Sequence, residues 1–353
     1  MDSRIYIKIF FMVISTFIIS LCIVPYIKNI AKHVNALDIP NERKVHKKPM
    51  PRLGGVAIFI AFLCGYMLYG EPSATMNSIL IASFIIVLTG VVDDIKPLKA
   101  SHKFVGQILA SLVITLYGNI LLQDVSAFGL YFDFGIFSYP LTIFFILGCI
   151  NCMNLIDGLD GLAAGISSIY FATIGIIATM QGKFGLDFIL TFVMLGSTLG
   201  FLVHNFNPAS IFMGDSGSMF LGLIIAVIAL LGFKNVTMTS LIIPLLILAI
   251  PILDTCFAIL RRLLKGESIS KPDKFHIHHQ LLKRNLSQRT TVLVIYFVNI
   301  LFAICSIIYV LKDPILGYIS YGILLTIVLL FVFNTNVVFE KSIKEKIMEK
   351  LKK

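Results

Sequence analysis

Residues 141–180 read LTIFFILGCINCMNLIDGLDGLAAGISSIYFATIGIIATM. Apolar runs lie on either side of the polar stretch 151–161, and they predict spans over 139–155 and 162–181, near the length of about 20 residues that crosses a bilayer. Asn or Asp recurs every third residue of the polar stretch, so a helical backbone would bring these side chains near one face. Because carboxylates and amides are costly inside lipid, the pattern predicts membrane helices that carry a functional site at one end.

The composition of the whole chain also indicates a membrane protein. Of the 353 residues, 58% are hydrophobic and 14% are charged, against about 45–50% and about 25% in soluble domains. The formal charge of +10 is typical of the Lys and Arg excess in cytoplasmic loops. No basic patch with a stacking motif accompanies it, so we exclude nucleic acid as a partner. The six cysteines lie in apolar runs, where thiols pack as small hydrophobic side chains.

Apolar runs of spanning length recur along the chain and predict the fold class, an all-α, polytopic transmembrane bundle of about eleven helices. We expect one catalytic domain over 1–335 and a basic tail over 336–353. The stretch 123–138, with two aspartates and two glycines, predicts a short hairpin. The predicted spans are 5–27, 53–70, 77–92, 104–122, 139–155, 162–181, 187–203, 217–233, 240–260, 290–311 and 316–334.

The distribution of positive charge predicts the orientation. Loops 28–52, 93–103 and 261–289, with the tail after 335, hold 24 of the 29 Lys and Arg residues. Positive residues are retained on the cytoplasmic side, so we expect the N-terminus outside and the C-terminus in the cytoplasm. The chain is then a multi-pass protein of the inner (plasma) membrane.

Five polar clusters follow the first, third, fifth, seventh and ninth predicted spans. An alternating topology therefore brings all five to the cytoplasmic face and predicts an active site there. The clusters are RKVHKKPMPRLGG at 43–55, GVVDDIK at 90–96, NCMNLIDGLDG at 151–161, HNFNPASIFMGDSGS at 204–218 and KPDKFHIHH at 271–279.

The first two clusters suit phosphate or metal chemistry. Lysines precede a glycine pair in the first cluster, where cations could bind phosphate, and an ordinary positive-inside loop is the alternative. Asp93 and Asp94 are adjacent and repel one another, so a proton or a cation must lie nearby. They suit a general base or a magnesium contact, and a solvated helix end is the alternative.

The later clusters offer hard oxygen donors and imidazoles. The donors that recur from Asn151 to Asp160 resemble a Mg²⁺ and substrate site. Asp215, among glycines and serines at a helix start, could hold a metal-bound phosphate, with simple capping of the helix as the alternative. Three histidines within 276–279 favour contact with phosphate or sugar over a zinc site, because zinc sites usually use other spacings.

Read together, PRLGG, VVDDIK, NxxNLIDGLDG, HNFNPA…MGDSGS and HIHH occur in an order that resembles the polyprenyl-phosphate N-acetylhexosamine-1-phosphate transferase family, over about residues 40–285. The chain looks most like the bacterial enzymes that place N-acetylglucosamine 1-phosphate on undecaprenyl phosphate and start teichoic-acid linkage units, O-antigens of lipopolysaccharide or related glycans. The muramoyl-pentapeptide branch typically has a TMGG-type first motif and three consecutive histidines, where this chain has PRLGG and HIHH.

The resemblance implies a Mg²⁺-dependent glycosyl-phosphotransferase, with Mn²⁺ as an alternative metal. Its partners would be undecaprenyl phosphate, a UDP-sugar and the lipid bilayer, with a homodimer left open. Asn154 and Asp215 match metal-binding positions, and Asp93 and Asp94 match the catalytic aspartate pair. The expected substrate-binding residues are Lys47, Lys48, Lys103, Asn151, Asp157, Asp160, His276, His278 and His279.

Three other classes stay open at this point. A muramoyl-pentapeptide phosphotransferase-type enzyme would use the same site with another donor. A membrane transporter would also carry intramembrane carboxylates, but these should lie near the bilayer midplane and within an inverted repeat. A CDP-alcohol phosphotransferase would have an Ala-Arg step after its Asp-Gly pair, which Asp157-Gly158 lacks.

Overall fold

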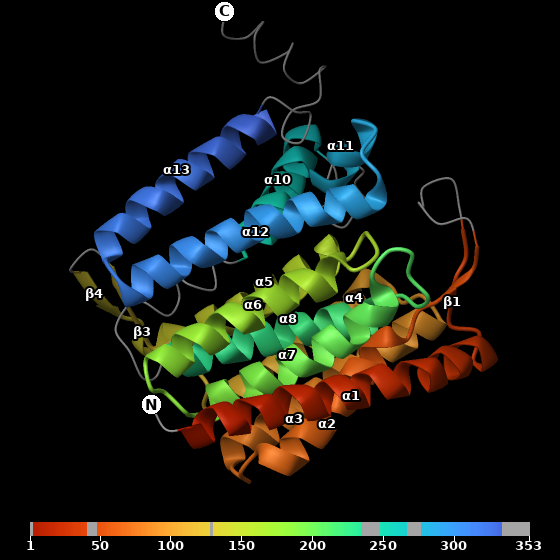
Figure 1. The fold of residues 1–353 in the computed structure, drawn as a ribbon, viewed down its shortest axis with the longest axis horizontal. Coiled ribbons are helices and arrows are strands. Elements are labelled where there is room, and N and C mark those ends of the chain that lie inside the picture. Colours follow the sequence, from red (N-terminus) through yellow and green to blue (C-terminus); the bar gives the residue numbers. More distant parts are fainter. Residues whose placement is uncertain (1–2, 41–47, 128–129, 234–247, 267–276, 334–353) are drawn as a thin grey trace, which may run out of the picture. The chain divides into compact units, whose positions relative to one another are not determined.

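The computed structural model describes residues 3–40, 48–127, 130–233, 248–266 and 277–333 (Figure 1). The chain divides into two compact units, Met1–Pro244 and Leu245–Lys353. The predicted boundary between catalytic domain and basic tail, at 335/336, lies outside the described residues and stays a prediction.

The first unit is mainly helical. Short strands form two separate two-stranded sheets, and turns of π-helix and 3₁₀-helix join longer helices. In chain order its elements are α1 (Ser3–His33), β1 (Leu37–Asp38), β2 (Met50–Pro51), α2 (Gly54–Tyr69), α3 (Ala74–Ile95), α4 (Ala100–Leu112), a π-helix (Val113–Tyr117), β3 (Asp124–Ala127), β4 (Leu130–Asp133), a 3₁₀-helix (Gly135–Phe137), α5 (Ser138–Ile156), α6 (Leu162–Met180), α7 (Leu186–Asn205) and α8 (Gly214–Phe233).

The second unit has four described helices: α10 (Ala249–Lys265), α11 (Ile277–Lys283), α12 (Gln288–Leu311) and α13 (Pro314–Phe333). Helix α12 packs against each of the other three. The carboxylate of Asp254 on α10 accepts a hydrogen bond from the backbone N–H of Ile277 at 2.8 Å, which satisfies one donor at the start of α11. Ser287 caps α12 by accepting the N–H of Thr290 at 3.1 Å.

Among the described residues, eight helices are long and apolar enough to cross a membrane: α1, α3, α5, α6, α7, α8, α12 and α13. They confirm a polytopic helical membrane protein, while the count of eleven and the orientation of the termini stay predictions. Three predicted spans do not reach this length as single apolar helices. Helix α2 has 16 residues, α4 ends at Leu112 and continues as a π-helix, and the span 240–260 lies partly outside the described residues.

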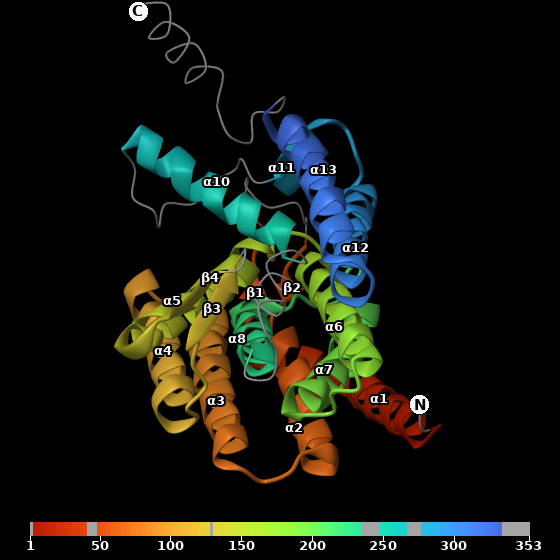
Figure 2. The same cartoon turned by 90° about the vertical axis from the view of Figure 1, so that its left-hand side faces the viewer.

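Helix α8 forms the core of the first unit. Its sequence is apolar on all sides after the first turn, as expected for a helix that is surrounded by other helices. It contacts α2, α3, α5, α6 and α7, and Figure 2 shows it in the middle of this unit. In its most apolar stretch 94% of the residues are buried. The polar first turn of α8 therefore points out of the core at one end of the unit.

The opposite end of the first unit carries the predicted hairpin. Strands β3 and β4 pair antiparallel, with Asp124 opposite Asp133 and Ala127 opposite Leu130. This confirms a hairpin within 123–138, next to the start of α5. Asp124 and Asp133 are both exposed.

Candidate active site

Four of the five polar clusters meet at one end of the first unit, around the first turn of α8. Backbone hydrogen bonds tie the PRLGG segment to the residues before α8: the N–H of Phe212 donates to the carbonyl of Pro51 at 2.8 Å, and the N–H of Gly55 donates to Met213 at 2.8 Å. Segments far apart in sequence therefore lie side by side here. The alternating topology inferred from hydropathy accounts for this convergence.

Two glycines let helices α2 and α3 approach the start of α8 at backbone distance. A Cβ atom at Gly55 would overlap the backbone of Gly217, and one at Gly90 would overlap the backbone of Ser216. Both positions therefore require glycine for packing. The glycine pair in PRLGG thus permits contact between helices, rather than a contact with phosphate.

Asp94, at the end of α3, caps α8 from outside that helix. Its side chain accepts the N–H of Asp215 at 2.9 Å and the N–H of Ser216 at 3.1 Å, and the Ser216 hydroxyl donates to it at 2.7 Å. Arg52 adds an ion pair at 3.1 Å. The first turn of α8 is thus capped by a carboxylate from another helix, and two of the N–H groups at the start of α8 are already bonded.

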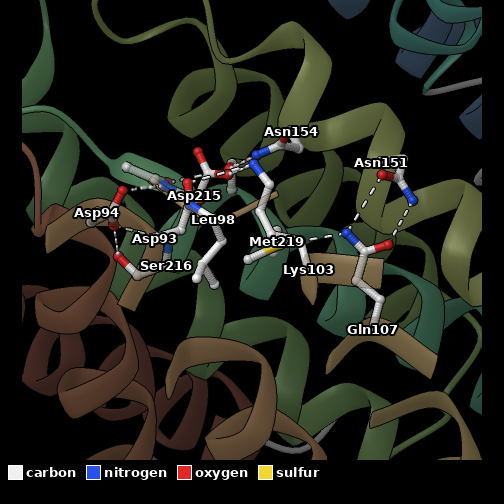
Figure 3. Close-up of polar contacts among 12 residues, drawn as sticks. Asp93, Asp94, Leu98, Lys103, Gln107, Asn151, Asn154, Asp215, Ser216 and Met219 are labelled. Atoms are coloured by element: carbon white, nitrogen blue, oxygen red, sulfur yellow. Dashed lines mark hydrogen bonds and ion pairs between the residues drawn. The ribbon is translucent and has the colours of Figure 1, made fainter. Parts of the chain in front are cut away.

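Asp215 lies between two cations, of which Lys103 is labelled in Figure 3. Its Oδ2 is 2.8 Å from the ammonium of Lys103, and its Oδ1 is 3.3 Å from the guanidinium of Arg52. Burial opposes the positive charge of both cations, but the neighbouring aspartates outweigh it and raise the pKa of Lys103 and of Arg52 above their ordinary values. Both side chains are therefore fixed positive charges.

Asp93 bonds to the segment that follows α3 and lies near Lys103. Its Oδ1 accepts the N–H of Leu98 at 2.7 Å, and its Oδ2 is 3.5 Å from Lys103. The residue is 6% exposed, so it is largely shielded from water. Asp93 and Asp94 are neighbours in sequence, yet their partners differ: Asp94 bonds mainly to the start of α8, and Asp93 faces Lys103.

The two asparagines at the end of α5 also reach neighbouring helices. Asn154 donates from Nδ2 to the hydroxyl of Ser218 at 2.9 Å, in the first turns of α8. Asn151 forms a reciprocal amide pair with Gln107 on α4, with its Nδ2 2.9 Å from the Gln107 Oε1. Gln107 was not among the residues that the sequence indicated, because a single glutamine in an apolar run carries no motif.

The two aspartates between α5 and α6 differ in their surroundings. Asp160 accepts hydrogen bonds from the side chain of Asn207 at 2.8 Å and the N–H of Ala209 at 3.1 Å, so it joins two of the polar clusters. Asp157 is half-buried. Burial, and then the charge of Asp215, raise the pKa of Asp157 to about 7.

The other predicted contacts stay predictions. Lys48 is exposed, and Lys47 and His276 lie outside the described residues. His278 and His279 belong to α11 in the second unit, where His278 is buried and the two rings lie 4.3 Å apart between centroids. Arg52 completes the site, although only its position within PRLGG marked it in the sequence.

The donor set fits a hard divalent cation. Asp93, Asp94 and Asp215 each offer a carboxylate oxygen within 4.8 Å of the others, and they are the one such group of three in the described part of the chain. Carboxylate and amide oxygens are the ligands that Mg²⁺ prefers. Asp94 bonds to the start of α8, so Asp215 and Asn154 are the residues that could hold such an ion, with Asp93 nearby.

The apolar helices make the chain a polytopic helical membrane protein. The buried aspartates and fixed cations at the start of α8 fit a site for phosphate chemistry. The sequence model of a family described as glycosyl transferase family 4 matches residues 76–233. A probable undecaprenyl-phosphate N-acetylglucosaminyl 1-phosphate transferase of Bacillus subtilis (strain 168) is 44% identical over 303 residues, which are 84% of each chain. The chain belongs to this transferase family, as the order of its motifs predicts.

More distant relatives agree. A decaprenyl-phosphate N-acetylglucosaminephosphotransferase of Mycobacterium leprae is 33% identical over 298 residues, 76% of this chain and 75% of that one. An undecaprenyl-phosphate alpha-N-acetylglucosaminyl 1-phosphate transferase of Escherichia coli (strain K12) is 30% identical over 285 residues, 78% of this chain and 77% of that one. All three names describe transfer to a polyprenyl phosphate.

Proposed function

We propose that the chain transfers N-acetylglucosamine 1-phosphate from UDP-N-acetylglucosamine to undecaprenyl phosphate and releases UMP. The observation that carries the proposal is the convergence of Asp93, Asp215, Lys103 and Arg52 on the first turn of α8. The names of the relatives supply the transferred group and the acceptor.

The reaction joins two anions, so charge is its main obstacle. An oxygen of the lipid phosphate forms a bond to the sugar-bearing phosphorus, and the bond from that phosphorus to UMP breaks, with UMP leaving as the anion. Lys103 and Arg52 place fixed positive charge where negative charge gathers, in a partly buried site. We favour a single displacement, because Asp215 already contacts both cations.

The aspartates take separate roles in this proposal. Asp93 orients the incoming lipid phosphate or accepts its proton, since it lies beside the fixed positive charge of Lys103. Asp94 holds the start of α8 in place. Asp215 and Asn154 would hold Mg²⁺, or Mn²⁺ in its place, and the bound ion would neutralise charge on the pyrophosphate.

The setting of the reaction also belongs to the proposal. We place the protein in the inner (plasma) membrane with its active site toward the cytoplasm, where soluble UDP-sugars occur, and we leave a homodimer open. The product would begin a cell-envelope glycan such as a teichoic acid or a lipopolysaccharide. A muramoyl-pentapeptide-type donor and a transporter are the alternatives, and the carboxylates argue against a transporter because they gather at one end of the unit.

Release of UMP by the purified protein tests the proposal. The protein receives undecaprenyl phosphate, Mg²⁺ and UDP-N-acetylglucosamine, and parallel reactions omit the lipid, chelate the metal or offer a CDP-alcohol. We expect UMP only with both lipid and metal, and loss of UMP in Asp215→Ala. Asp187→Ala is the matched control, because Asp187 lies in the first turn of α7, at the other end from the site.

Each outcome is informative. Turnover with another UDP-sugar alone would keep the reaction and change the donor. No turnover with any UDP-sugar would contradict the proposed reaction and restore the transporter alternative.

A further inference from the structure

Gln107 and Asn151 form a buried polar contact one helical turn away from the site. Gln107 is 4% exposed, and the two amides donate to each other: Asn151 Nδ2 is 2.9 Å from Gln107 Oε1, and Gln107 Nε2 is 3.5 Å from Asn151 Oδ1. Asn151 Nδ2 also donates to the carbonyl of Leu147 at 2.8 Å. The functional groups of Asn151 are thus engaged within the protein.

The pair connects three helices. Gln107 lies on α4, Asn151 on α5, and Gln107 Nε2 is also 3.5 Å from the sulfur of Met219 on α8. Exchange of oxygen and nitrogen in one amide alone would lose both bonds, and the bond from Asn151 Nδ2 to the Leu147 carbonyl fixes the orientation of the pair. Figure 3 shows the pair beside the site, with Met219 between it and the aspartates. It therefore sets the register of α4 against α5.

Both partners share a helix face with a residue of the site. Lys103 precedes Gln107 by four residues, and Asn154 follows Asn151 by three, so each lies about one turn from the pair on the same face. Lys103 reaches Asp215 at 2.8 Å, and Asn154 reaches Ser218 at 2.9 Å. Two side chains from different helices thus arrive at the first turns of α8.

We propose that the Gln107–Asn151 amide pair is a positioning element, which holds Lys103 and Asn154 against the start of α8. The inference deepens the proposed function and, for its kinetic test, rests on it. Asn151 then acts through its neighbours rather than by contact with the substrate. Gln107 is a positioning residue that no motif marks.

The kinetic test compares Gln107→Leu with the wild type and with Ser111→Ala. Ser111 lies one turn further along α4, is buried, and donates only to the carbonyl of Gln107 within its own helix, so it controls for damage to α4. We expect Gln107→Leu to lower kcat about 10-fold to 10²-fold, because small displacements of reacting groups have large effects. We expect KM for the UDP-sugar and the melting temperature to change little.

Two further variants separate positioning from substrate binding. The double exchange Gln107→Asn with Asn151→Gln keeps the summed length of the pair, and we expect it to recover most of the kcat that either single exchange loses. In a Lys103→Ala background, Gln107→Leu should have little further effect. Wild-type kcat in Gln107→Leu, no recovery in the double exchange, or additive losses with Lys103→Ala would overturn the proposal.

A third measurement does not depend on activity. An amine-reactive reagent at one fixed pH, read by mass spectrometry, reports how well the ion pairs protect Lys103. We expect labelling of Lys103 to rise several-fold in Gln107→Leu and to stay at the wild-type level in Ser111→Ala. Unchanged labelling in Gln107→Leu would contradict the positioning role even if the wild type were inactive with every UDP-sugar. If the wild type were inactive with every UDP-sugar but labelling of Lys103 still rose in Gln107→Leu, only the proposed reaction would be contradicted.

Discussion

The two ends of the first unit both carry aspartates, but in different surroundings. At the α8 end, Asp94 and Asp215 share Arg52 at 3.1 Å and 3.3 Å. At the hairpin end, Asp124 and Asp133 face each other across β3 and β4 and are exposed, and the described residues pair no cation with either.

This difference shows what turns aspartates into a site. Exposed carboxylates remain hydrated, and water screens their repulsion. Buried carboxylates must share cations and N–H groups, because an unpaired charge in the interior is costly. Burial beside α8 therefore produces a preorganised set of charges, and the same residue type at the hairpin remains a surface charge.

We expect the largest loss of activity from a substitution at Asp215, at the α8 end. Asp215→Asn removes the charge that both Lys103 and Arg52 contact, so we expect kcat to fall about 10²-fold to 10³-fold in the UMP-release assay. Asp133→Asn makes the same change at the hairpin and should stay within about twofold of wild type, since surface substitutions have small effects. Similar losses in both variants would show that the α8 end is not special.

A smaller effect is expected at Lys103. Lys103→Ala removes the ammonium 2.8 Å from Asp215, and we expect kcat to fall about 10-fold to 10²-fold, with partial recovery in Lys103→Arg because the charge returns. Lys183→Ala, between α6 and α7, is the control and should keep wild-type turnover. If Lys183→Ala lost as much activity, a general role of positive charge would replace a specific one.

A third prediction concerns packing rather than charge. Gly55→Ala places a Cβ atom against the backbone of Gly217, and overpacking of this kind costs about 1–3 kcal/mol. We expect a lower melting temperature and lower activity together. Gly148→Ala on α5 meets nothing within 4 Å and should be neutral or stabilising, as alanine favours helix over glycine. Equal melting temperatures for the two variants would contradict the close approach of α2 to α8.

The smallest expected effect depends on pH and concerns Asp157. Its pKa is raised to about 7, mainly by burial, so the charged form destabilises the folded state. This cost is absent below the ordinary pKa, grows as pH rises, and is complete above about pH 7. We expect Asp157→Asn to melt at a higher temperature than wild type at about pH 8 and at a similar temperature at about pH 4. If the difference in melting temperature between Asp157→Asn and wild type did not change with pH, ionisation of Asp157 would be excluded as its cause.

Much of the fold follows from the sequence, because long apolar runs must form helices in lipid. The hairpin within 123–138 and the meeting of four polar clusters were predictable from turn residues and from alternating topology. The local form of each helix was not predictable. Helix α4 carries Lys103 and Gln107 among its apolar residues and continues as a π-helix after Leu112, and a hydropathy window does not separate such a helix from a regular span.

The site was predictable in outline but not in its partners. Motif spacing indicated Asp93, Asp94 and Asp215, yet nothing in a sequence tells which of two adjacent aspartates caps a helix more than 100 residues away. The contacts of Gln107 depend on how three helices pack. Such tertiary contacts leave no local pattern, so only the structure reveals them.

The most direct test of the account follows the phosphorus of the donor. UDP-N-acetylglucosamine labelled in the phosphate next to the sugar is incubated with the protein, undecaprenyl phosphate and Mg²⁺, and the lipid and nucleotide fractions are separated. The account predicts that the label enters the lipid fraction and that unlabelled UMP forms in equal amount. Label that leaves in UDP would show transfer of the sugar without its phosphate, and it would contradict the central claim.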